Sequence, residues 1–442
     1  MNQHTPIPRT IVQAAIQKTG LTNVGGASIR EIRRLIDLIE ADSGVRFLRM
    51  EMGIPGLAPP VIGVEAERAA LAAGVAQHYP PVAGVPELKR EVSRFVRNVI
   101  GVSVSEEGCL PTVGTLQGSM AAFLVAGHMH PGRRTVLFLD PGFPVHALQA
   151  RMLGLEVRRL DIADSRGPAL AAALEAHLAD GSVCALLYSN PNNPTWMCLN
   201  DQELAVIAAA ADRHDLLVLE DFAYIAMDTR TPYRIDGNAP FQPSVLHHSD
   251  RALLLISSSK AFSYAGQRVG MLVVPDGQYN RHYPELIGWF GHERFGAALT
   301  LGALYGFSAG VSHSAQYGLA AILKAVNEGE YRFLDTADEY RRRASEAKRI
   351  FVRHGFNIVY DTDVDQPLGD GFYFTIAYPG FTGEALVAEL FNYGISAIAL
   401  SSTGARREGL RACVSFLPTE VMPELDRRLA AFRADHPVSN VP

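Results

Sequence analysis

The lysine at position 260 lies where an apolar segment ends among serines. Residues 252–256 form a continuous apolar run, which is the pattern of a fully buried strand. A lysine at such a strand end can point into a cleft, where lost solvation makes its amine a nucleophile towards carbonyl carbon. The hydroxyls of Ser257 and Ser259, with Arg268 eight residues after Lys260, suit a phosphate bound beside it. A solvated loop lysine among helix-capping serines is the alternative interpretation.

Two other polar clusters also follow strand-like runs. Residues 190–195 contain two Asn-Pro pairs after a run that ends at Tyr188, and Asp221 and Tyr224 follow a run that ends at Leu219. Ligands of a parallel sheet bind at the carboxyl ends of its strands. Lysine suits an aldehyde, a carboxylate suits a ring nitrogen, and Asn and Tyr suit a phenolate oxygen. An aldehyde, a ring nitrogen and a phenolate oxygen, together with a phosphate, are the functional groups of pyridoxal phosphate (PLP). Its ring withdraws electrons only if an anion keeps the ring nitrogen protonated.

The pattern of elements predicts how these residues are positioned. From about residue 109, short apolar runs alternate with helical patterns, which is typical of a parallel α/β sheet covered by helices. The predicted strands are 135–139, 156–160, 184–188, 216–219, 253–256 and 271–274. The predicted helices include 115–126, 144–152, 168–178 and 201–214. The last of these has Asn200 as N-cap and Glu203 three residues on, a capping-box variant.

Other helical patterns flank this region. The predicted elements are helices over 28–40, 65–74, 87–99 and 328–354, followed by a mixed stretch with elements at 357–360, 371–376, 383–393 and 411–416. We expect residues 1–55 to form an arm that contributes to a small domain. Residues 56–323 are expected to form a large cofactor-binding domain, and residues 324–442 the small α+β domain.

These motifs resemble those of fold-type I PLP enzymes, specifically the class I and II aminotransferases of the aspartate aminotransferase superfamily. The resemblance covers nearly the whole chain. It implies a PLP-transferase fold, with a mostly parallel seven-stranded sheet between helices and a smaller α+β domain. The motif Ser-x-x-Lys followed by Arg matches Ser257, Lys260 and Arg268. It implies an internal aldimine at Lys260 and a phosphate held by the other two side chains.

Further matches assign roles around the cofactor. The Asn-Pro-Thr motif at 193–195 implies that Asn193 donates to the phenolate oxygen and lies beside the substrate. The Asp-x-x-Tyr motif places Asp221 on the ring nitrogen and Tyr224 beside the phenolate oxygen. The segment after residue 140 implies that Phe143 stacks on the ring and that His146 touches Asp221.

The remaining matches concern phosphate, substrate and assembly. The turn Gly114-Thr115-Leu116 resembles the phosphate loop at a helix N-terminus, where free N–H groups favour an anion. Tyr79 matches a tyrosine that reaches the neighbouring subunit's phosphate, which implies a homodimer with shared active sites. Arg411 matches the arginine that binds the substrate α-carboxylate, and Gly53 is expected beside the same substrate.

Two residues depart from the family pattern. Trp196 stands where glycine usually follows Asn-Pro-Thr, so we expect the indole either to adopt an ordinary dihedral and lie over the pocket or to pack outwards. Arg294 lies near where enzymes for acidic substrates place a side-chain-binding arginine of the partner subunit. An ion pair with Glu293 or an interface contact is the alternative for Arg294.

The resemblance implies an aminotransferase that moves an amino group between an L-amino acid and a 2-oxo acid. The alternative keeps the fold and cofactor but changes the reaction to β- or γ-elimination or replacement, decarboxylation or a specialised biosynthetic step. A non-catalytic regulator fused to a DNA-reading domain is a third hypothesis. It would need a basic helix-turn-helix ahead of the main body, and that pattern is absent from the sequence.

Composition excludes several other classes. The formal charge is -6, with no run of Lys and Arg, so we expect no nucleic-acid partner. The four cysteines are scattered without CxxC spacing, which predicts reduced thiols in the cytoplasm and no metal site. Residues 295–323 carry no charge, but their serines, glycines and glutamine favour buried domain interior over a membrane span. The first twenty residues lack a secretory apolar segment.

Overall fold

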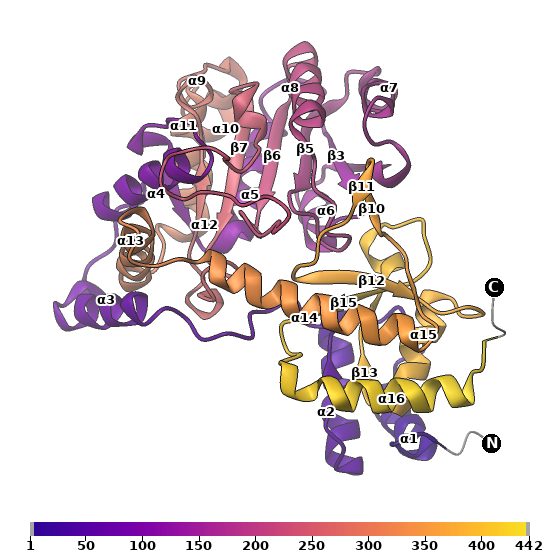
Figure 1. Ribbon diagram of the computed structural model, residues 1–442. Coiled ribbons are helices and arrows are strands. Elements are labelled where there is room, and N and C mark those ends of the chain that lie inside the picture. Colours follow the sequence, from indigo (N-terminus) through magenta and orange to yellow (C-terminus); the bar gives the residue numbers. More distant parts are fainter. Residues whose placement is uncertain (1–3, 439–442) are drawn as a thin grey trace. The chain divides into compact units, whose positions relative to one another are not determined.

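The computed structural model describes residues 4–438, which form two compact units (Figure 1). The larger unit comprises Leu57–Asn192 and Cys198–Ala337. The smaller unit comprises the chain up to Gly56, the segment Asn193–Met197 and the chain from Asp338 onwards. Asn193–Met197 therefore belongs to a different unit from the residues on either side of it.

A seven-stranded sheet forms the centre of the larger unit, in the order β2-β8-β7-β6-β5-β3-β4. The strands are β2 (Cys109–Thr112), β3 (Thr135–Asp140), β4 (Glu156–Asp161), β5 (Val183–Ser189), β6 (Leu217–Phe222), β7 (Ala252–Ser257) and β8 (Gly270–Val273). Strand β8 is antiparallel to both neighbours, and the remaining pairs are parallel. The predicted α/β class with a mostly parallel seven-stranded sheet is confirmed. The carboxyl ends of β5, β6 and β7 lie at one edge, where ligands of such sheets bind.

Helices connect and cover these strands. They are α3 (Val61–Ala72), α4 (Pro86–Val99), α5 (Gly114–Ala126), α6 (Pro144–Met152), α7 (Ala169–Leu178), α8 (Asp201–His214), α9 (Asp276–Tyr279), α10 (Ile287–Phe290), α11 (Phe295–Ala297), α12 (Tyr305–Ser308) and α13 (His313–Asn327). Helix α5 lies in the apolar core, with Phe123 edge-on to Phe138 of β3 at 5.9 Å between ring centroids. A Cβ at Gly118 would lie 3.0 Å from Leu255 of β7, so α5 packs closely on the sheet.

Strand β2 is absent from the predicted strands because Pro111 lies in its middle. Proline cannot donate to a ladder and so argues against a strand. In the structure β2 pairs only with β8, at the edge of the sheet. An edge strand leaves one row of N–H groups without a neighbour, so proline is tolerated there.

The smaller unit contains helices and short strands. Its helices are α1 (Arg9–Thr19), α2 (Ile29–Ser43), α15 (Gly383–Leu390), α16 (Met422–Asp435) and most of α14 (Leu334–Arg353). Strands β14 (Ile398–Ala399), β15 (Leu410–Cys413), β12 (Tyr373–Ala377) and β9 (Asn357–Ile358) form a sheet in that order. Strand β1 (Leu48–Arg49) pairs with β13 (Ile395–Ser396), and β10 (Thr362–Asp363) pairs with β11 (Gln366–Pro367). Helices α1 and α16 were not predicted.

The uncharged stretch 295–323 is not uniformly buried, so the expectation of domain interior is wrong for part of it. Leu301, Tyr305 and Phe307 are exposed, whereas α13 buries most of its apolar residues. Glycines and a π-helical turn, Ala298–Leu304, interrupt the stretch. Within residues 4–438, no helix combines the length and apolar character needed to cross a bilayer.

The capping box of α8 is confirmed. Asn200 Oδ1 accepts a hydrogen bond from the Glu203 N–H at 3.0 Å, and Glu203 Oε2 accepts one from the Asn200 N–H at 3.1 Å. Glu203 also forms a buried ion pair with Arg166. The start of α8 is thereby fixed just after the segment that carries the Asn-Pro-Thr motif.

We predict that Asn200→Ala lowers the free energy of unfolding by about 1 kcal/mol, because an N–H at the helix start loses its acceptor. Urea denaturation measures the change. Asn200→Ser, which keeps a capping oxygen, is the matched control and should retain most of the stability. An equal loss in both variants would show that the cap is not the cause.

Candidate active site

Asp221 lies in β6, close to the carboxyl end of the central strand, with only 5% of its surface exposed. Its Oδ1 accepts a hydrogen bond from the Ala223 N–H at 3.0 Å. Its Oδ2 lies 4.0 Å from Nε2 of His146, which is buried in α6. The expected proximity of His146 to Asp221 is therefore present in the structure.

Burial dominates the electrostatics of this pair. It raises the pKa of Asp221 to about 7, although the Ala223 N–H and the charge of Lys260 act in the opposite direction. Burial also lowers the pKa of His146 to about 4, so the imidazole is neutral at pH 7. A cation placed beside a buried carboxyl favours its ionised form. The protonated ring nitrogen of PLP is such a cation, so Asp221 fits the role assigned to it.

Phe143 is the N-cap residue of α6 and lies three residues before His146. Its ring is edge-on to the imidazole, with 5.6 Å between the centroids and 89° between the planes. Phe143, His146 and Asp221 line one small cavity. The aromatic ring expected to stack on the cofactor and the carboxylate expected to hold its nitrogen thus face the same space.

An anion cradle is built where α5 begins. Gly114 has a φ of +65°, and a Cβ there would lie 2.5 Å from Nη2 of Arg268. A Cβ at Gly270 would lie 3.1 Å from the Thr115 nitrogen. Both glycines therefore allow the guanidinium and the first turn of the helix to approach each other. Free N–H groups, the helix dipole and an arginine together form a phosphate-binding arrangement.

Hydroxyl groups of β2 and β7 complete the donor set near the cradle. Thr112 Oγ1 is buried at the end of β2 and makes no hydrogen bond within the part of the chain that the structure describes. Ser257 Oγ accepts the Ser259 N–H at 3.1 Å, so its own O–H remains available to donate. Thr112 was not predicted as a site residue, because a threonine inside a strand carries no motif.

The loop that carries Lys260 is closed by a hydrogen bond of a neighbouring serine. Ser258 donates its hydroxyl to the Val269 carbonyl at 2.5 Å and so closes the loop that carries Lys260. Lys260 lies in the same unit as Asp221 and interacts with it electrostatically.

The two tyrosines expected in the site differ in exposure. Tyr224, expected beside the phenolate oxygen, is buried just after β6, with 2% of its surface exposed. Tyr79 is 91% exposed.

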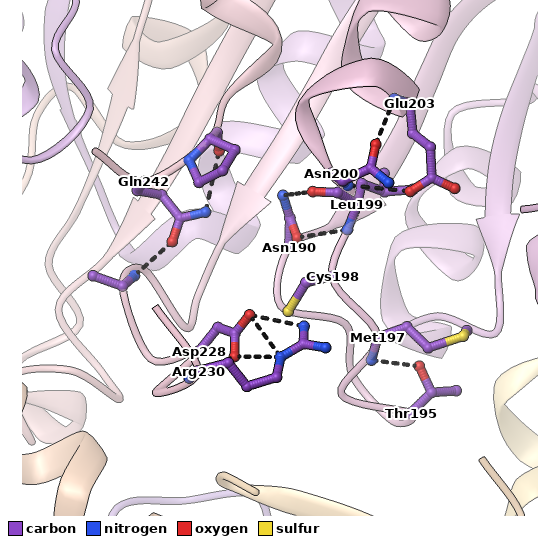
Figure 2. A network of polar contacts seen from close by, with 12 residues as sticks. Asn190, Thr195, Met197, Cys198, Leu199, Asn200, Glu203, Asp228, Arg230 and Gln242 are labelled. Atoms are coloured by element: carbon purple, nitrogen blue, oxygen red, sulfur yellow. Dashed lines mark hydrogen bonds and ion pairs between the residues drawn. The ribbon is translucent and has the colours of Figure 1, made fainter. Parts of the chain in front are cut away.

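Asn190 holds the base of the loop after β5. Its Oδ1 accepts the Leu199 N–H at 3.1 Å, and its Nδ2 donates to the Leu199 carbonyl at 3.5 Å (Figure 2). Its backbone N–H donates to the Asp221 carbonyl at 3.1 Å. These bonds join the two ends of the excursion that contains Asn193–Met197. Asn190 was named in the motif without a role, since only the folded loop brings Leu199 to it.

Arg411 is the centre of the residues that the smaller unit brings together. It lies on β15 with 2% of its surface exposed. Nη2 donates to the Glu51 carbonyl at 2.6 Å, and Nη1 donates to Asn193 Oδ1 at 3.3 Å. Its guanidinium carbon lies 4.6 Å from the centre of the Tyr373 ring. Nε of Arg411 is buried without a hydrogen-bond acceptor within residues 4–438, so an N–H is available to an anion.

Gly53 and Trp196 belong to the same group. A Cβ at Gly53 would lie 2.0 Å from Tyr373 Oη. Trp196 is fully buried and has a φ of +68°, in the left-handed region. The expectation of an ordinary dihedral is therefore wrong: the tryptophan has a glycine-like backbone, and its indole is buried within the unit. The missing side chain at Gly371 gives the indole its space.

The alternative interpretation expected an ion pair between Arg294 and the neighbouring Glu293, and the structure shows a different partner. It forms an ion pair with Glu107 at 3.6 Å, and its guanidinium lies over the Tyr279 ring at 5.5 Å. Glu293 instead pairs with His282. No group of three or more His, Cys, Asp or Glu side chains is arranged to bind a metal in the described residues.

Comparison with known proteins identifies the family. The family model for aminotransferase class I and II matches residues 53–429, and the chain belongs to this family. A probable aminotransferase, TAT2 of Arabidopsis thaliana, is 26% identical over 282 residues, which are 62% of this chain and 66% of that protein. Nicotianamine aminotransferase B of Hordeum vulgare is 29% identical over 59% of this chain and 47% of its own length. The chain thus spans about half to two thirds of these curated relatives.

Solved structures show the same fold. An aspartate aminotransferase double mutant from Thermus thermophilus has a TM-score of 0.73 at 20% identity, over 92% of this chain and 96% of that chain. An aminotransferase from Mycobacterium tuberculosis has a TM-score of 0.72 at 19% identity, over 98% of both chains. Members of the family depend on PLP. The buried carboxyl at Asp221 and the cradle at Gly114 and Arg268 fit its ring nitrogen and its phosphate.

The raised pKa of Asp221 predicts a pH dependence of stability in the cofactor-free protein. Because the folded-state pKa of about 7 lies above the ordinary 3.8, the native state binds this proton more tightly than the unfolded chain. Its contribution is present at low pH and is lost as the pH rises to about 7. Relative to Asp221→Asn, the free energy of unfolding of the wild type should fall by about 1.4 kcal/mol per pH unit within this window.

Urea denaturation of both apoproteins between pH 5 and pH 7 measures the difference. The asparagine keeps an oxygen that accepts the Ala223 N–H but does not titrate. Curves that stay parallel over this range would contradict the raised pKa.

Proposed function

We propose that the protein is a PLP-dependent aminotransferase that moves an amino group between an L-amino acid and a 2-oxo acid. The observation that carries the proposal is the buried carboxyl of Asp221, in the same unit as Lys260 and the glycine–arginine cradle of Gly114 and Arg268. Membership of the aminotransferase family supports the reaction. The alternative PLP reactions have no comparable support.

The larger unit supplies the proton chemistry. When bound, PLP withdraws electrons from the substrate's α-carbon. Asp221 holds the ring nitrogen protonated, and the neutral His146 behind it competes for no proton at pH 7. Lys260 would hold the cofactor through its aldehyde group, and the lysine amine would act as general base towards the proton on the substrate's α-carbon. Phe143 stacks on the ring.

Backbone and side-chain hydrogen-bond donors hold the phosphate. Gly114, Thr115 and Leu116 present helix N–H groups to the phosphate, together with Ser257 and Arg268.

On the substrate side, Arg411 binds the α-carboxylate, and its buried Nε supports this role. Asn193 and Tyr224 hydrogen-bond the phenolate oxygen. Gly53 and Trp196 line the substrate side.

We also propose a homodimer in which Tyr79 serves the partner's phosphate. Its 91% exposure supports a role outside its own subunit. Helix α3 presents several exposed apolar side chains, which favours coverage by a second copy. They are Val61, Ile62, Val64 and Leu71.

Two further proposals concern organisation. The smaller unit acts as the small domain, expected over residues 1–55 and 324–442, and the larger unit as the cofactor-binding domain, expected over residues 56–323. The two units depart from these bounds at 193–197 and at 324–337. The four cysteines, scattered through the sequence without CxxC spacing, support a cytoplasmic location.

We predict that Lys260→Ala lowers the transamination rate by about 1,000-fold or more, because the reaction loses both its nucleophile and its general base. Amino donors are screened with 2-oxoglutarate and pyruvate, and the bound cofactor is followed by its visible absorbance. Lys18→Ala, at an exposed lysine paired with Asp42, is the control.

Mixing the wild type with an amino acid alone distinguishes transamination from the other PLP reactions. Transamination predicts stoichiometric pyridoxamine phosphate and a 2-oxo acid. A full rate in Lys260→Ala would disprove the assignment of the lysine, and a product without pyridoxamine phosphate would disprove transamination.

The proposed dimer predicts that the double variant Val61→Glu and Val64→Glu shifts the protein towards monomer, because four exposed charges would be buried per interface. Sedimentation velocity measures the change. Val352→Glu alters a valine of α14 that is 52% exposed, against 74% for Val61, and should leave the assembly unchanged. An unchanged sedimentation coefficient in the double variant would contradict an interface through α3.

A further inference from the structure

Trp196 combines a conformation and an environment that rarely occur together. Its φ of +68° lies in a region that L-residues with bulky side chains avoid. Its indole is nevertheless fully buried. Such a conformation persists only where surrounding contacts determine it, and such residues cluster at functional sites. The contacts of the indole therefore indicate what the residue does.

The first contact is with Gly371, at the approach to β12. A Cβ at this glycine would lie 2.0 Å from Cε2 of the indole, 2.1 Å from Cζ2 and 2.3 Å from Nε1. The indole therefore lies directly on the backbone at Gly371, and no other residue type leaves room for it. A tryptophan at 196 and a glycine at 371 form a matched pair within the smaller unit.

The second contact is with Tyr373, two residues further along. The two rings are edge to face, with 6.3 Å between centroids and 70° between planes. The other sides of the tyrosine are also confined: its hydroxyl abuts Gly53 and its face carries the guanidinium of Arg411 at 4.6 Å. Tyr373 is therefore held in one orientation between the indole and the arginine.

The sheet register explains why Tyr373 meets Arg411. Thr375 of β12 is paired with Arg411 of β15, so Tyr373 and Arg411 are diagonal neighbours on the same face. The guanidinium carbon lies 4.6 Å from the centre of the tyrosine ring, while Nη1 donates to Asn193 Oδ1 and Nη2 donates to the Glu51 carbonyl. Loss or movement of the Tyr373 ring would change the orientation of the Arg411 guanidinium. The buried Nε would then point in a different direction.

We propose that Trp196 is a positioning residue for Arg411: through Tyr373, its indole sets the orientation in which the guanidinium binds the α-carboxylate. This proposal rests on the proposed function of Arg411. It assigns to Trp196 control over carboxylate affinity, and no part in proton transfer.

Kinetics of the PLP-loaded enzyme test the proposal. In Trp196→Leu, the KM for the amino donor should rise about tenfold, because the guanidinium is misplaced, while kcat changes less than threefold. Trp196→Phe keeps an aromatic edge towards Tyr373 and should restore KM to within about threefold of the wild type. Phe123→Leu makes a comparable core change in the larger unit and should leave KM unchanged. A KM in Trp196→Leu that matches Phe123→Leu would overturn the proposal.

A double-mutant cycle tests the route through Tyr373. If Trp196 acts through that ring, the KM of Trp196→Leu with Tyr373→Leu should equal that of the more affected single variant. Additive effects would show that Trp196 acts independently and would reject the route.

Arg411→Lys separates the two proposals. A KM unchanged in Arg411→Lys would refute the assigned role of the arginine, whereas a raised KM there with a normal KM in Trp196→Leu would refute the role of Trp196 alone.

Fluorescence gives a readout that does not depend on activity or on the folding of Trp196 variants. The chain has two tryptophans, so Trp289→Phe leaves Trp196 as the only tryptophan. Trp289 is 68% exposed, and its substitution should therefore disturb the fold little. Titration of this variant with acetate, a carboxylate without an amine, should change the Trp196 emission. Adding Arg411→Lys should abolish the change. No change with acetate would mean that the indole does not sense the guanidinium and would overturn the proposal.

Discussion

The cost of burying a carboxyl group at the centre of a parallel sheet is the constraint around which the larger unit is built. Asp221 lies in the middle strand of the sheet, and burial raises its pKa to about 7. Around it lie an amide N–H, a neutral imidazole and the more distant charge of Lys260. Such a carboxyl becomes fully ionised when a cation lies against it, and the protonated ring nitrogen of the family's cofactor would be a cation of this kind. The same energetic cost that would weaken an apoprotein thus favours binding of the protonated ring.

The second organising feature is the short excursion between β5 and α8. Asn190 ties both ends of this loop together and also bonds the backbone of Asp221. The five residues between the tied ends, Asn193–Met197, make their contacts with the smaller unit. One loop therefore provides an acceptor for Arg411, at Asn193, and a buried indole, at Trp196. The bonds of Asn190 and the capping box of α8 fix the base of the loop within the larger unit.

Much of the candidate site could be predicted because its chemistry is carried by residue types in local motifs. Lys260 follows a buried strand, and Asp221 lies near the carboxyl end of the neighbouring strand, so their shared edge follows from the parallel topology. Gly114 was predicted at a helix start, where its positive φ and its closeness to Arg268 are observed. Strand β2 was missed because Pro111 is compatible with a strand only at a sheet edge. Tyr373 was missed because its importance comes from its diagonal position to Arg411, which depends on the pairing register.

The amino-acid sequence by itself determined the α/β class, the order of the main elements and the chemical identity of the side chains in the candidate site, because these depend on local periodicity and on short motifs. Only the tertiary structure decided the environment of those side chains. Desolvation of Asp221 depends on the residues packed around it from several strands and helices. The inward packing of Trp196 depends on a glycine 175 positions away in the chain, Gly371, whose missing side chain admits the indole. Burial and steric fit are sums over neighbours that are distant in sequence, and no local pattern records them.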